Sequence, residues 1–274
     1  MRNVGVIGNG FVGSAVANGF SLCANVKVYD KDPDRSLNSF SEIAESEYIF
    51  ICVPTPMASD GSADLTIIDS VLEQLFSHTN FNVGHSIIII KSTVPPGTIE
   101  GCTKKYSGGV FVSNPEFLTE RSANLDFINA SRIVLGGHPE ATGRVVWLYR
   151  DRFPYKEIVE TDFATAQFIK YMCNCFFAVK ISFMNEMFQA AKSLDVEWED
   201  ARRGFVLDGR IGNSHLDVPG HDGYMGFGGK CFPKDISGFI KTIQDAGISP
   251  LVLIAAWERN LEVRQSHDWE YLKN

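Results

Sequence analysis

The chain has 274 residues, of which 45% are hydrophobic and 21% are charged; its formal net charge is -8 and its pI is about 5.3. This length holds one large domain or two ordinary ones, and the composition is that of a soluble globular protein. The acidic balance argues against nonspecific binding to nucleic acid or to an anionic membrane surface, because the protein's field would repel polyanions.

No apolar run approaches the roughly 20 residues that a membrane-spanning helix needs, and the longest are residues 86–90 and 248–257. The first three residues lead directly into an apolar run, so we expect no signal peptide and a cytoplasmic protein. The six cysteines form no CxxC pair and no cluster at zinc spacing. We therefore expect reduced thiols and no metal site.

Short apolar, β-branched runs alternate with helical or loop sequence over the first 160 residues. The runs occupy residues 4–7, 26–29, 48–53, 87–90, 110–112 and 132–135. This alternation predicts an α/β fold with a doubly wound, mainly parallel sheet of the Rossmann type. A first helix is expected to run to Leu22.

The pattern changes near residue 161. Residues 163–194 contain no Gly or Pro and carry apolar residues at helical spacing, which predicts one long helix. An irregular segment rich in glycine follows, and then two helices are expected at 234–246 and 250–271. The predicted domains are an NAD-binding Rossmann domain, residues 1–160, and an all-helical domain, residues 161–274.

A dinucleotide-binding fingerprint follows the first predicted strand. Gly8, Gly10 and Gly13 form a GxGxxG between that strand and a helix. In this motif the glycines allow a tight turn, approach of the pyrophosphate to backbone N–H groups, and close packing of helix on strand. Cofactor contacts are expected along this motif, from Gly8, Gly10, Phe11, Val12 and Gly13.

Asp30 stands at the end of the second predicted strand, 22 residues after Gly8. This is close to the spacing of about 20 at which an acidic residue binds the adenosine ribose hydroxyls. Its charge would repel a 2′-phosphate, so the sequence favours NAD over NADP. The neighbouring Lys31 is expected to lie at the same site.

A glycine-rich stretch near the C-terminus contains one cysteine. Residues 226–235 read GFGGKCFPKD, and Pro233 followed by Lys234 and Asp235 indicates the start of a helix. A cysteine just before a helix N-terminus and between two lysines has surroundings that favour the reactive thiolate. Cys231 is therefore a candidate nucleophile, and the alternative is an inert cysteine in a glycine turn.

Two polar residues share one face of the long helix. Lys170 and Asn174 are four residues apart, so their side chains point from the same face one turn apart. A lysine can stabilise a developing oxyanion, and an asparagine can orient a hydroxyl that is being oxidised. The alternative is an exposed lysine with an asparagine of no special role.

Taken together, these motifs resemble those of the UDP-glucose/GDP-mannose dehydrogenase family over nearly the whole chain. The matching segments are the fingerprint, VPTP at 53–56 with Asp64 and Leu65, STVPPGT at 92–98, NPEFL at 114–118, RIV at 132–134, Lys170 with Asn174, KISFMNE at 180–186, RIG at 210–212, the glycine stretch 226–235, and Asn260.

The resemblance implies a four-electron oxidation of a nucleotide sugar, such as UDP-glucose, from a primary alcohol to a carboxylate with two NAD⁺. By analogy, Lys170 and Asp235 assist removal of the alcohol proton through a water. Cys231 traps the aldehyde as a thiohemiacetal, whose oxidation gives a thioester. Glu116, with Thr93 and a water, then supports hydrolysis. A thiolate adduct is needed because an aldehyde cannot itself donate a hydride.

The resemblance also assigns binding residues. Further cofactor contacts are implied for Pro54, Thr55, Thr93 and Glu120, with Glu120 on the nicotinamide side. The implied substrate contacts are Glu116, Phe117, Leu118, Lys170, Asn174, Arg210, Gly228 and Gly229. Gln167 departs from the family, which often has Glu before the catalytic lysine.

Family members usually continue into a second Rossmann-like domain that supplies much of the nucleotide binding, whereas this sequence ends at Asn274. We therefore interpret it as a short form of the family. The family dimerises through the long helix, whose apolar residues include Phe176, Phe183 and Met184. A homodimer is expected, with the helical part as its dimerisation domain.

Two other readings share these motifs. A β-hydroxyacid dehydrogenase has a Rossmann domain, a helical domain and a KxxxN helix, but it transfers one hydride and needs no cysteine. A non-catalytic NAD-binding remnant, or a partner subunit that depends on another chain, would carry the same N-terminal motifs.

Overall fold

The computed structural model describes residues 1–271. Its contacts divide the chain into two compact units. The first consists of Met1–Thr55 and Asp64–Lys170, and the second of Pro56–Ala63 and the chain from Tyr171 onward. The predicted domain ranges, 1–160 and 161–274, remain a prediction.

The first unit is built on one sheet. Within residues 1–271 the sheet has seven strands: β1 (Arg2–Ile7), β2 (Ala24–Tyr29), β3 (Tyr48–Ile51), β4 (Ile87–Ile90), β5 (Val110–Ser113), β6 (Arg132–Gly137) and β7 (Glu157–Thr161). Their order is β2-β1-β3-β4-β5-β6-β7, and every pair is parallel except β5 and β6. The central strands β3 and β4 are fully buried, as the continuous apolar runs predict.

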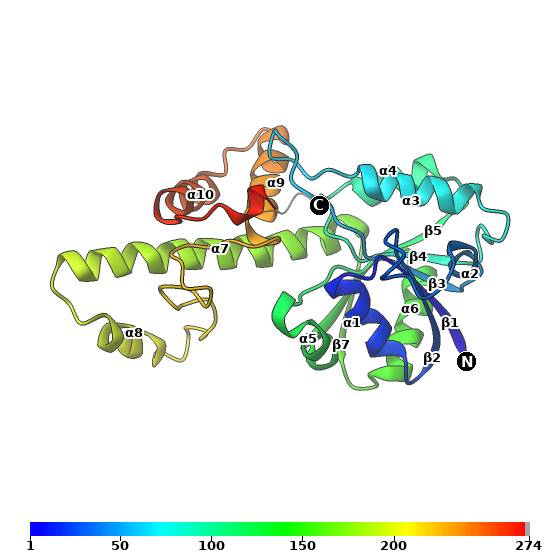
Figure 1. Ribbon diagram of the computed structural model, residues 1–274, viewed down its shortest axis with the longest axis horizontal. Helices are drawn as coiled ribbons and strands as arrows, with labels where there is room; N and C mark the ends of the chain where they lie inside the picture. The colour runs from blue at the N-terminus through cyan, green and yellow to red at the C-terminus, as the bar shows by residue number, and fades with distance from the viewer. Residues whose placement is uncertain (272–274) are drawn as a thin grey trace. The chain divides into compact units, whose positions relative to one another are not determined.

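Helices cover both faces of this sheet (Figure 1). One core cluster joins the sheet to α1 (Phe11–Phe20), α5 (Ala123–Asn129) and α6 (Pro139–Arg152). The other joins it to α2 (Phe40–Ala44), α3 (Thr66–Ser77) and α4 (Thr98–Lys105). A short 3-10 helix, η1 (Glu120–Ser122), precedes α5. The predicted Rossmann-type, doubly wound fold is confirmed, and so is the helical region after it.

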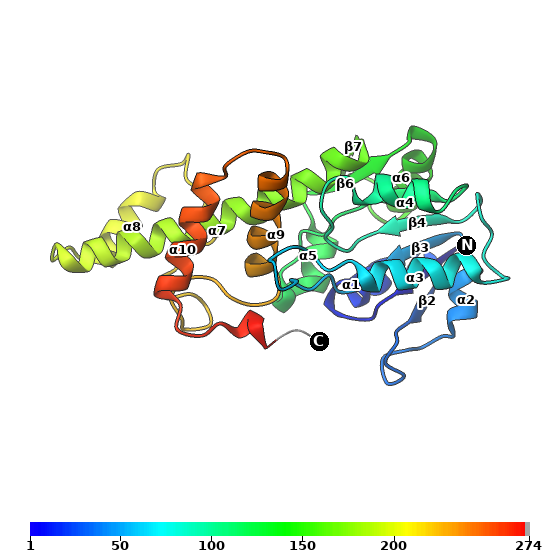
Figure 2. The same cartoon turned by 90° about the horizontal axis from the view of Figure 1, so that it is seen from above.

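The second unit is helical. It contains α7 (Phe163–Ser193) from Tyr171 onward, α8 (Trp198–Val206), α9 (Phe232–Asp245), α10 (Leu251–Val263) and η2 (Asp268–Glu270). Its main core lies around Tyr171, Phe227 and Phe239, and a smaller core lies around Met184 and Leu216. In Figure 2, α9 and α10 lie side by side, in agreement with their residue contacts.

The long helix is predicted almost to the residue, but two other helix ends are wrong and two elements were not predicted. The first helix ends at Phe20 rather than Leu22. The last helix ends at Val263 instead of residue 271, because the backbone of Arg264 is extended. A helix, α8, lies in the segment expected to be irregular, and strand β7 was not predicted.

None of the helices within residues 1–271 has both the length and the apolar character that a bilayer crossing requires.

Candidate active site

The loop between β1 and α1 has its shape because of its glycines. Gly8 has a φ of +95°, and a Cβ on Gly13 would lie 1.8 Å from the carbonyl oxygen of Gly8. At Gly10, by contrast, a Cβ would meet nothing within 4 Å, and no side chain caps the first turn of α1. The first N–H groups of α1 are therefore positioned to receive an anion, as dinucleotide sites require.

Asp30 closes this loop from the end of β2. Its Oδ2 accepts a hydrogen bond from the backbone N–H of Asn9 at 2.6 Å, and its Oδ1 accepts one from that of Asp32 at 2.9 Å. A carboxylate has lone pairs for further partners, so ribose hydroxyls can still bind. The neighbouring Lys31 is exposed, while Phe11 and Val12 are half-buried at the start of α1. These residues fit NAD.

The segments that follow β3 and β4 are joined by a hydrogen bond. The hydroxyl of Thr55 donates to the carbonyl oxygen of Thr93 at 2.8 Å, and both residues are buried. This is the carboxyl edge of the sheet, where doubly wound folds bind their ligands. Pro54 is exposed beside Thr55, and Glu120 is exposed at the start of η1.

A buried ion pair joins Glu116 to Lys170. The Lys170 ammonium donates to Glu116 Oε1 at 2.7 Å, and the two side chains are only 3% and 6% exposed. The other carboxylate oxygen accepts the N–H of Leu118 at 2.6 Å. The Phe117 ring lies 5.7 Å from the same ammonium. Three of the predicted substrate residues, Glu116, Leu118 and Lys170, are therefore directly connected.

Opposing effects act on the Glu116 carboxyl. Burial raises its pKa, but the charge of Lys170 and its hydrogen bond, the Leu118 N–H and the charge of Lys91 lower it. The net result is a pKa below the ordinary range. Glu116 is therefore ionised at neutral pH, as an acceptor of protons must be.

In the second unit, Asn174 and Asp235 form a second buried contact. The amide nitrogen of Asn174 donates to Asp235 Oδ2 at 2.6 Å, and the two residues are 7% and 1% exposed. Lys234 also forms an ion pair with the Asp235 carboxylate. Both Asn174 and Lys170 come from α7, four residues apart, as predicted.

Cys231 is the N-cap residue of α9, so its thiol stands at the positive end of that helix. Within residues 1–271 it forms no disulfide, and it is half-buried. Asp235 follows in the first turn, and its backbone N–H donates to the carbonyl oxygen of Cys231 at 2.9 Å. The predicted helix start after the cysteine is confirmed.

Side chains from three elements hold the glycine loop before Cys231. Asn185 on α7 accepts the N–H of Gly226 at 3.0 Å. Asn260 on α10 accepts the N–H of Phe227 at 2.7 Å and donates to its carbonyl oxygen at 3.0 Å. Asp268 on η2 accepts the N–H of Gly229 at 3.0 Å. These hydrogen bonds therefore fix the backbone that leads to Cys231.

A buried arginine supports the last of these contacts. The Arg264 guanidinium pairs with Asp222 at 2.8 Å and with Asp268 at 3.5 Å. At Gly228 a Cβ would lie 2.2 Å from the same guanidinium, so a side chain there would displace the Arg264 side chain.

Arg210 lies elsewhere in the second unit. Its side chain is 89% exposed and pairs with Asp208 two residues away. Within residues 1–271, no hydrogen bond or ion pair joins it to the other predicted substrate residues, and its role remains a prediction.

Comparison with known proteins gives a consistent result. The UDP-glucose/GDP-mannose dehydrogenase family model matches in two parts, the NAD binding domain over residues 35–152 and the central domain over residues 164–262. The solved structure of a UDP-glucose dehydrogenase from Pyrobaculum islandicum is 30% identical, with a TM-score of 0.84, over 96% of this chain and 68% of that chain.

The chain belongs to the UDP-glucose/GDP-mannose dehydrogenase family.

Curated relatives point to the same family. The UDP-glucose 6-dehydrogenase TuaD of Bacillus subtilis is 31% identical over 97% of this chain and 64% of its own length. The UDP-glucose 6-dehydrogenase of Rickettsia conorii is 35% identical over 80% of this chain and 50% of its own length. The chain thus spans between half and two thirds of these relatives. It contains the NAD binding domain of the family, in agreement with the predicted cofactor.

Some residues that shape this family member's site were not assigned a role from sequence. Asn185 and Asn260 lie in family motifs, but their hydrogen bonds to the glycine loop were not foreseen. Lys91, Arg264 and Asp268 were not singled out at all. Lys91 directly precedes the family's STVPPGT segment, and this position was the available signal.

Proposed function

We propose that this chain carries out the NAD-dependent, four-electron oxidation of a nucleotide sugar's primary alcohol to a uronic acid, with UDP-glucose as the first substrate to test. The proposal extends to this chain the reaction class named for its relatives. When bound, NAD⁺ supplies the hydride acceptor for both oxidations, and two are used for each acid formed.

The first oxidation turns the alcohol into an aldehyde. The alcohol loses its hydroxyl proton and a hydride from the same carbon. In the proposed roles, Lys170 stabilises the developing alkoxide, while Asp235 receives the proton through a water. Asn174 donates to Asp235 at 2.6 Å, so it fixes the orientation of that carboxylate. Asn174 and Asp235 are both buried, and burial strengthens the hydrogen bond between them.

The second oxidation needs a covalent bond. The Cys231 thiolate adds to the aldehyde carbon, and the resulting thiohemiacetal again carries a hydrogen that leaves as hydride. The product is a thioester on Cys231. Water then attacks the thioester carbon and releases the acid and the thiol. The ionised Glu116, with Thr93 and that water, takes the water's proton in this last step.

The observation that carries the proposal is the position of Cys231. It stands as the N-cap residue of α9, in a loop held by Asn185, Asn260 and Asp268, with Asp235 one turn away. A helix N-terminus favours a thiolate, and a fixed loop favours a nucleophile over a packing residue.

A second candidate is a single-hydride dehydrogenase acting on a β-hydroxyacid, which would share this fold. The solved 3-hydroxyisobutyrate dehydrogenase of Mycobacterium tuberculosis has a TM-score of 0.76 over 97% of this chain and 95% of that chain. Its sequence identity is only 14%, so this likeness concerns the fold alone. A non-catalytic NAD-binding chain is the third candidate.

Replacing the thiol separates these candidates. With NAD⁺ and UDP-glucose, wild-type protein is expected to form the acid, and Cys231→Ser is expected to lose acid formation by at least about a thousandfold because the thioester cannot form. Cys23→Ser is the matched control, because Cys23 is a half-buried cysteine of the first unit. Full turnover by Cys231→Ser would support the single-hydride enzyme. Absence of both NADH formation and sugar-nucleotide binding in the wild type would contradict the proposal.

A further inference from the structure

A lysine that the proposed chemistry does not use is buried close to Glu116. Lys91 directly follows β4 and is only 4% exposed. Asn114 directly follows β5, the neighbouring strand, and is 1% exposed. Both stand at the carboxyl edge of the sheet. Because they follow two adjacent strands, they lie about one strand spacing apart. Glu116 comes two residues after Asn114.

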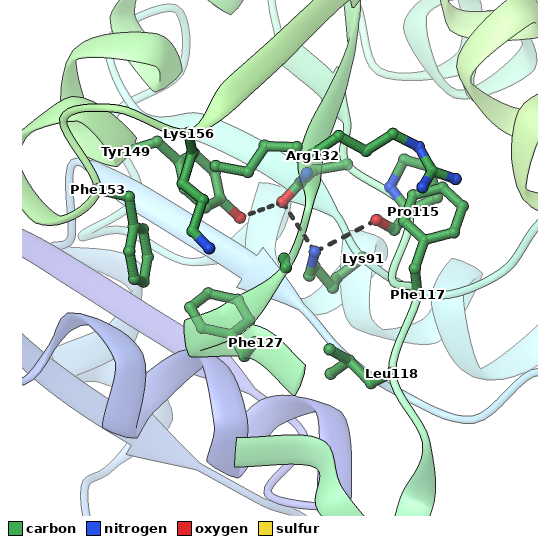
Figure 3. Close-up of a pocket in the computed structure, with 12 residues that line it drawn as sticks. Lys91, Pro115, Phe117, Leu118, Phe127, Arg132, Tyr149, Phe153 and Lys156 are labelled. Carbon is green, nitrogen blue, oxygen red and sulfur yellow. Dashed lines mark hydrogen bonds between the residues drawn. The ribbon is translucent and has the colours of Figure 1, made fainter. Parts of the chain in front are cut away.

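Hydrogen bonds join Lys91 to Asn114 and Pro115, the two residues before Glu116 (Figure 3). The Lys91 ammonium donates to Asn114 Oδ1 at 3.1 Å and to the carbonyl oxygen of Pro115 at 3.4 Å. The Tyr149 hydroxyl, from α6, donates to the same Asn114 oxygen at 2.5 Å. The Asn114 amide nitrogen donates to the carbonyl oxygen of Val134 at 2.9 Å. The residue before Glu116 is thus held through its carbonyl group.

Burial of the Lys91 ammonium at this place lowers the stability of the fold. Within residues 1–271 it forms no ion pair, and burial lowers its pKa to about 8. Removing an ammonium from water costs several kcal/mol unless hydrogen bonds and charges compensate. A cavity of about 30 Å³ adjoins it, lined in part by Phe127, Tyr149 and Phe153. This is room for a water.

The contacts of Lys91 point to the reason for its presence. Its two oxygen partners belong to Asn114 and Pro115, the residues that lead into Glu116. On the far side of Glu116, Leu118 N–H and the Lys170 ammonium hold the two carboxylate oxygens. Lys91 also acts on Glu116 through its charge, which favours the carboxylate form.

We propose that Lys91 is a positioning residue for Glu116: by binding Asn114 and the Pro115 carbonyl, it holds the 114–118 segment so that the Glu116 carboxylate is presented to water during thioester hydrolysis. This role rests on the proposed function, because it requires that Glu116 act in the hydrolytic step. It predicts that loss of Lys91 impairs the last step selectively, since the hydride-transfer steps do not depend on Glu116 as a base.

Lys91→Met tests this role, since methionine has a similar length without the charge. Acid formation is expected to fall at least about tenfold, with KM for UDP-glucose changed less than about twofold. The thioester is expected to accumulate, and acid quenching followed by mass analysis of the Cys231 peptide would detect it. Lys105→Met is the matched control, because Lys105 is a half-exposed lysine of the same unit that pairs with Glu73.

A readout independent of turnover is the Glu116 carboxyl signal in ¹³C NMR, assigned with Glu116→Gln. Its pKa is expected to rise in Lys91→Met, because one of the charges that lowers it is lost. If Lys91→Met does not fold, Tyr149→Phe replaces it, since the Tyr149 hydroxyl shares the Asn114 oxygen with Lys91. Its expected defect has the same pattern at smaller size.

The outcomes distinguish the proposed function from the positioning role of Lys91. A wild-type protein that makes no acid would contradict the proposed function. Acid formation by the wild type, with Lys91→Met equally active or impaired equally in the first hydride transfer and in hydrolysis, would overturn the positioning role alone. A selective loss of hydrolysis with thioester accumulation would support it.

Discussion

At the residue scale, the most consequential contact is the buried pair of Glu116 and Lys170. Sequence patterns placed Lys170 on a helix and the family resemblance gave Glu116 a role, but their contact joins residues 54 positions apart. No local pattern encodes such a pairing. It arises because the segment after β5 and the first part of α7 pack within the same unit.

Removing one partner of this pair leaves an uncompensated buried charge. Lys170→Met is expected to destabilise the protein by about 3–5 kcal/mol, because the Glu116 carboxylate then has no cation beside it. The double variant Glu116→Gln with Lys170→Met should recover most of that loss. Urea unfolding followed by circular dichroism measures both changes. Equal destabilisation in the single and double variants would show that the pair is not coupled.

The lowered pKa of Glu116 also sets a pH dependence. Because the folded-state pKa lies below the unfolded value of about 4.3, the carboxylate contributes stability above pH 4.3, and this is lost as pH falls through the folded value. The difference in unfolding free energy between wild type and Glu116→Gln should therefore be constant near neutral pH and shrink in acid. A difference that grows on acidification would contradict this sign.

At the element scale, β1, the fingerprint loop and α1 follow most directly from the sequence. The three glycines have separate physical tasks, and the structure distinguishes them. Gly13 permits contact between α1 and the loop, whereas Gly10 faces open space. Short-range constraints of this kind are local, which is why the motif predicts them well.

An added methyl group is therefore expected to lower stability at Gly13 and to weaken NAD binding at Gly10. Gly13→Ala is expected to cost more than about 3 kcal/mol, because its Cβ would meet the backbone oxygen of Gly8 at 1.8 Å. Gly10→Ala should leave stability within about 0.5 kcal/mol but weaken NAD binding at least about tenfold, by obstructing the approach of the pyrophosphate. Thermal unfolding and isothermal titration with NAD⁺ give the two quantities. Unchanged NAD affinity in Gly10→Ala would refute the cofactor position.

Elements were missed where tertiary contacts override local pattern. The final helix stops at Val263 because Arg264 turns out of it, and its guanidinium then pairs with Asp222 and Asp268. In α8, Gly204 obscured a helix that packs Trp198 against Phe188. Strand β7 is a short edge strand with few apolar residues, so its pattern is weak.

At the scale of the whole molecule, alternation of strands and helices predicted the fold class, and ordered motifs predicted the family. Both signals extend over many residues and tolerate local errors. The arrangement of side chains around Cys231 could not be obtained in this way. Asn185, Asn260 and Asp268 reach the glycine loop from 33 to 41 positions away, and only the folded chain brings them together.

The apolar surface of α7 leads to a prediction about assembly. Met172, Phe176 and Phe183 follow one another at helical spacing and are 52%, 62% and 47% exposed. Other apolar residues of the helix pack within the chain: Met184 is buried, and Phe177 stacks on His215. We propose that the exposed stripe forms a homodimer contact.

Light scattering tests this proposal. The wild type should have a mass twice the chain mass of 30.4 kDa, and Phe176→Glu with Phe183→Glu should have the mass of a single chain. Tyr155→Glu, at a fully exposed position of the first unit, is the control. A monomeric wild type, or a dimer that survives both substitutions, would contradict the proposal.

The most direct test of the proposed reaction is its stoichiometry. Wild-type protein is incubated with limiting UDP-glucose and excess NAD⁺, NADH is counted by absorbance, and the uronic acid is counted by mass spectrometry. The four-electron reaction through Cys231 predicts two NADH for each molecule of acid. One NADH per oxidised product, with no acid, would contradict it.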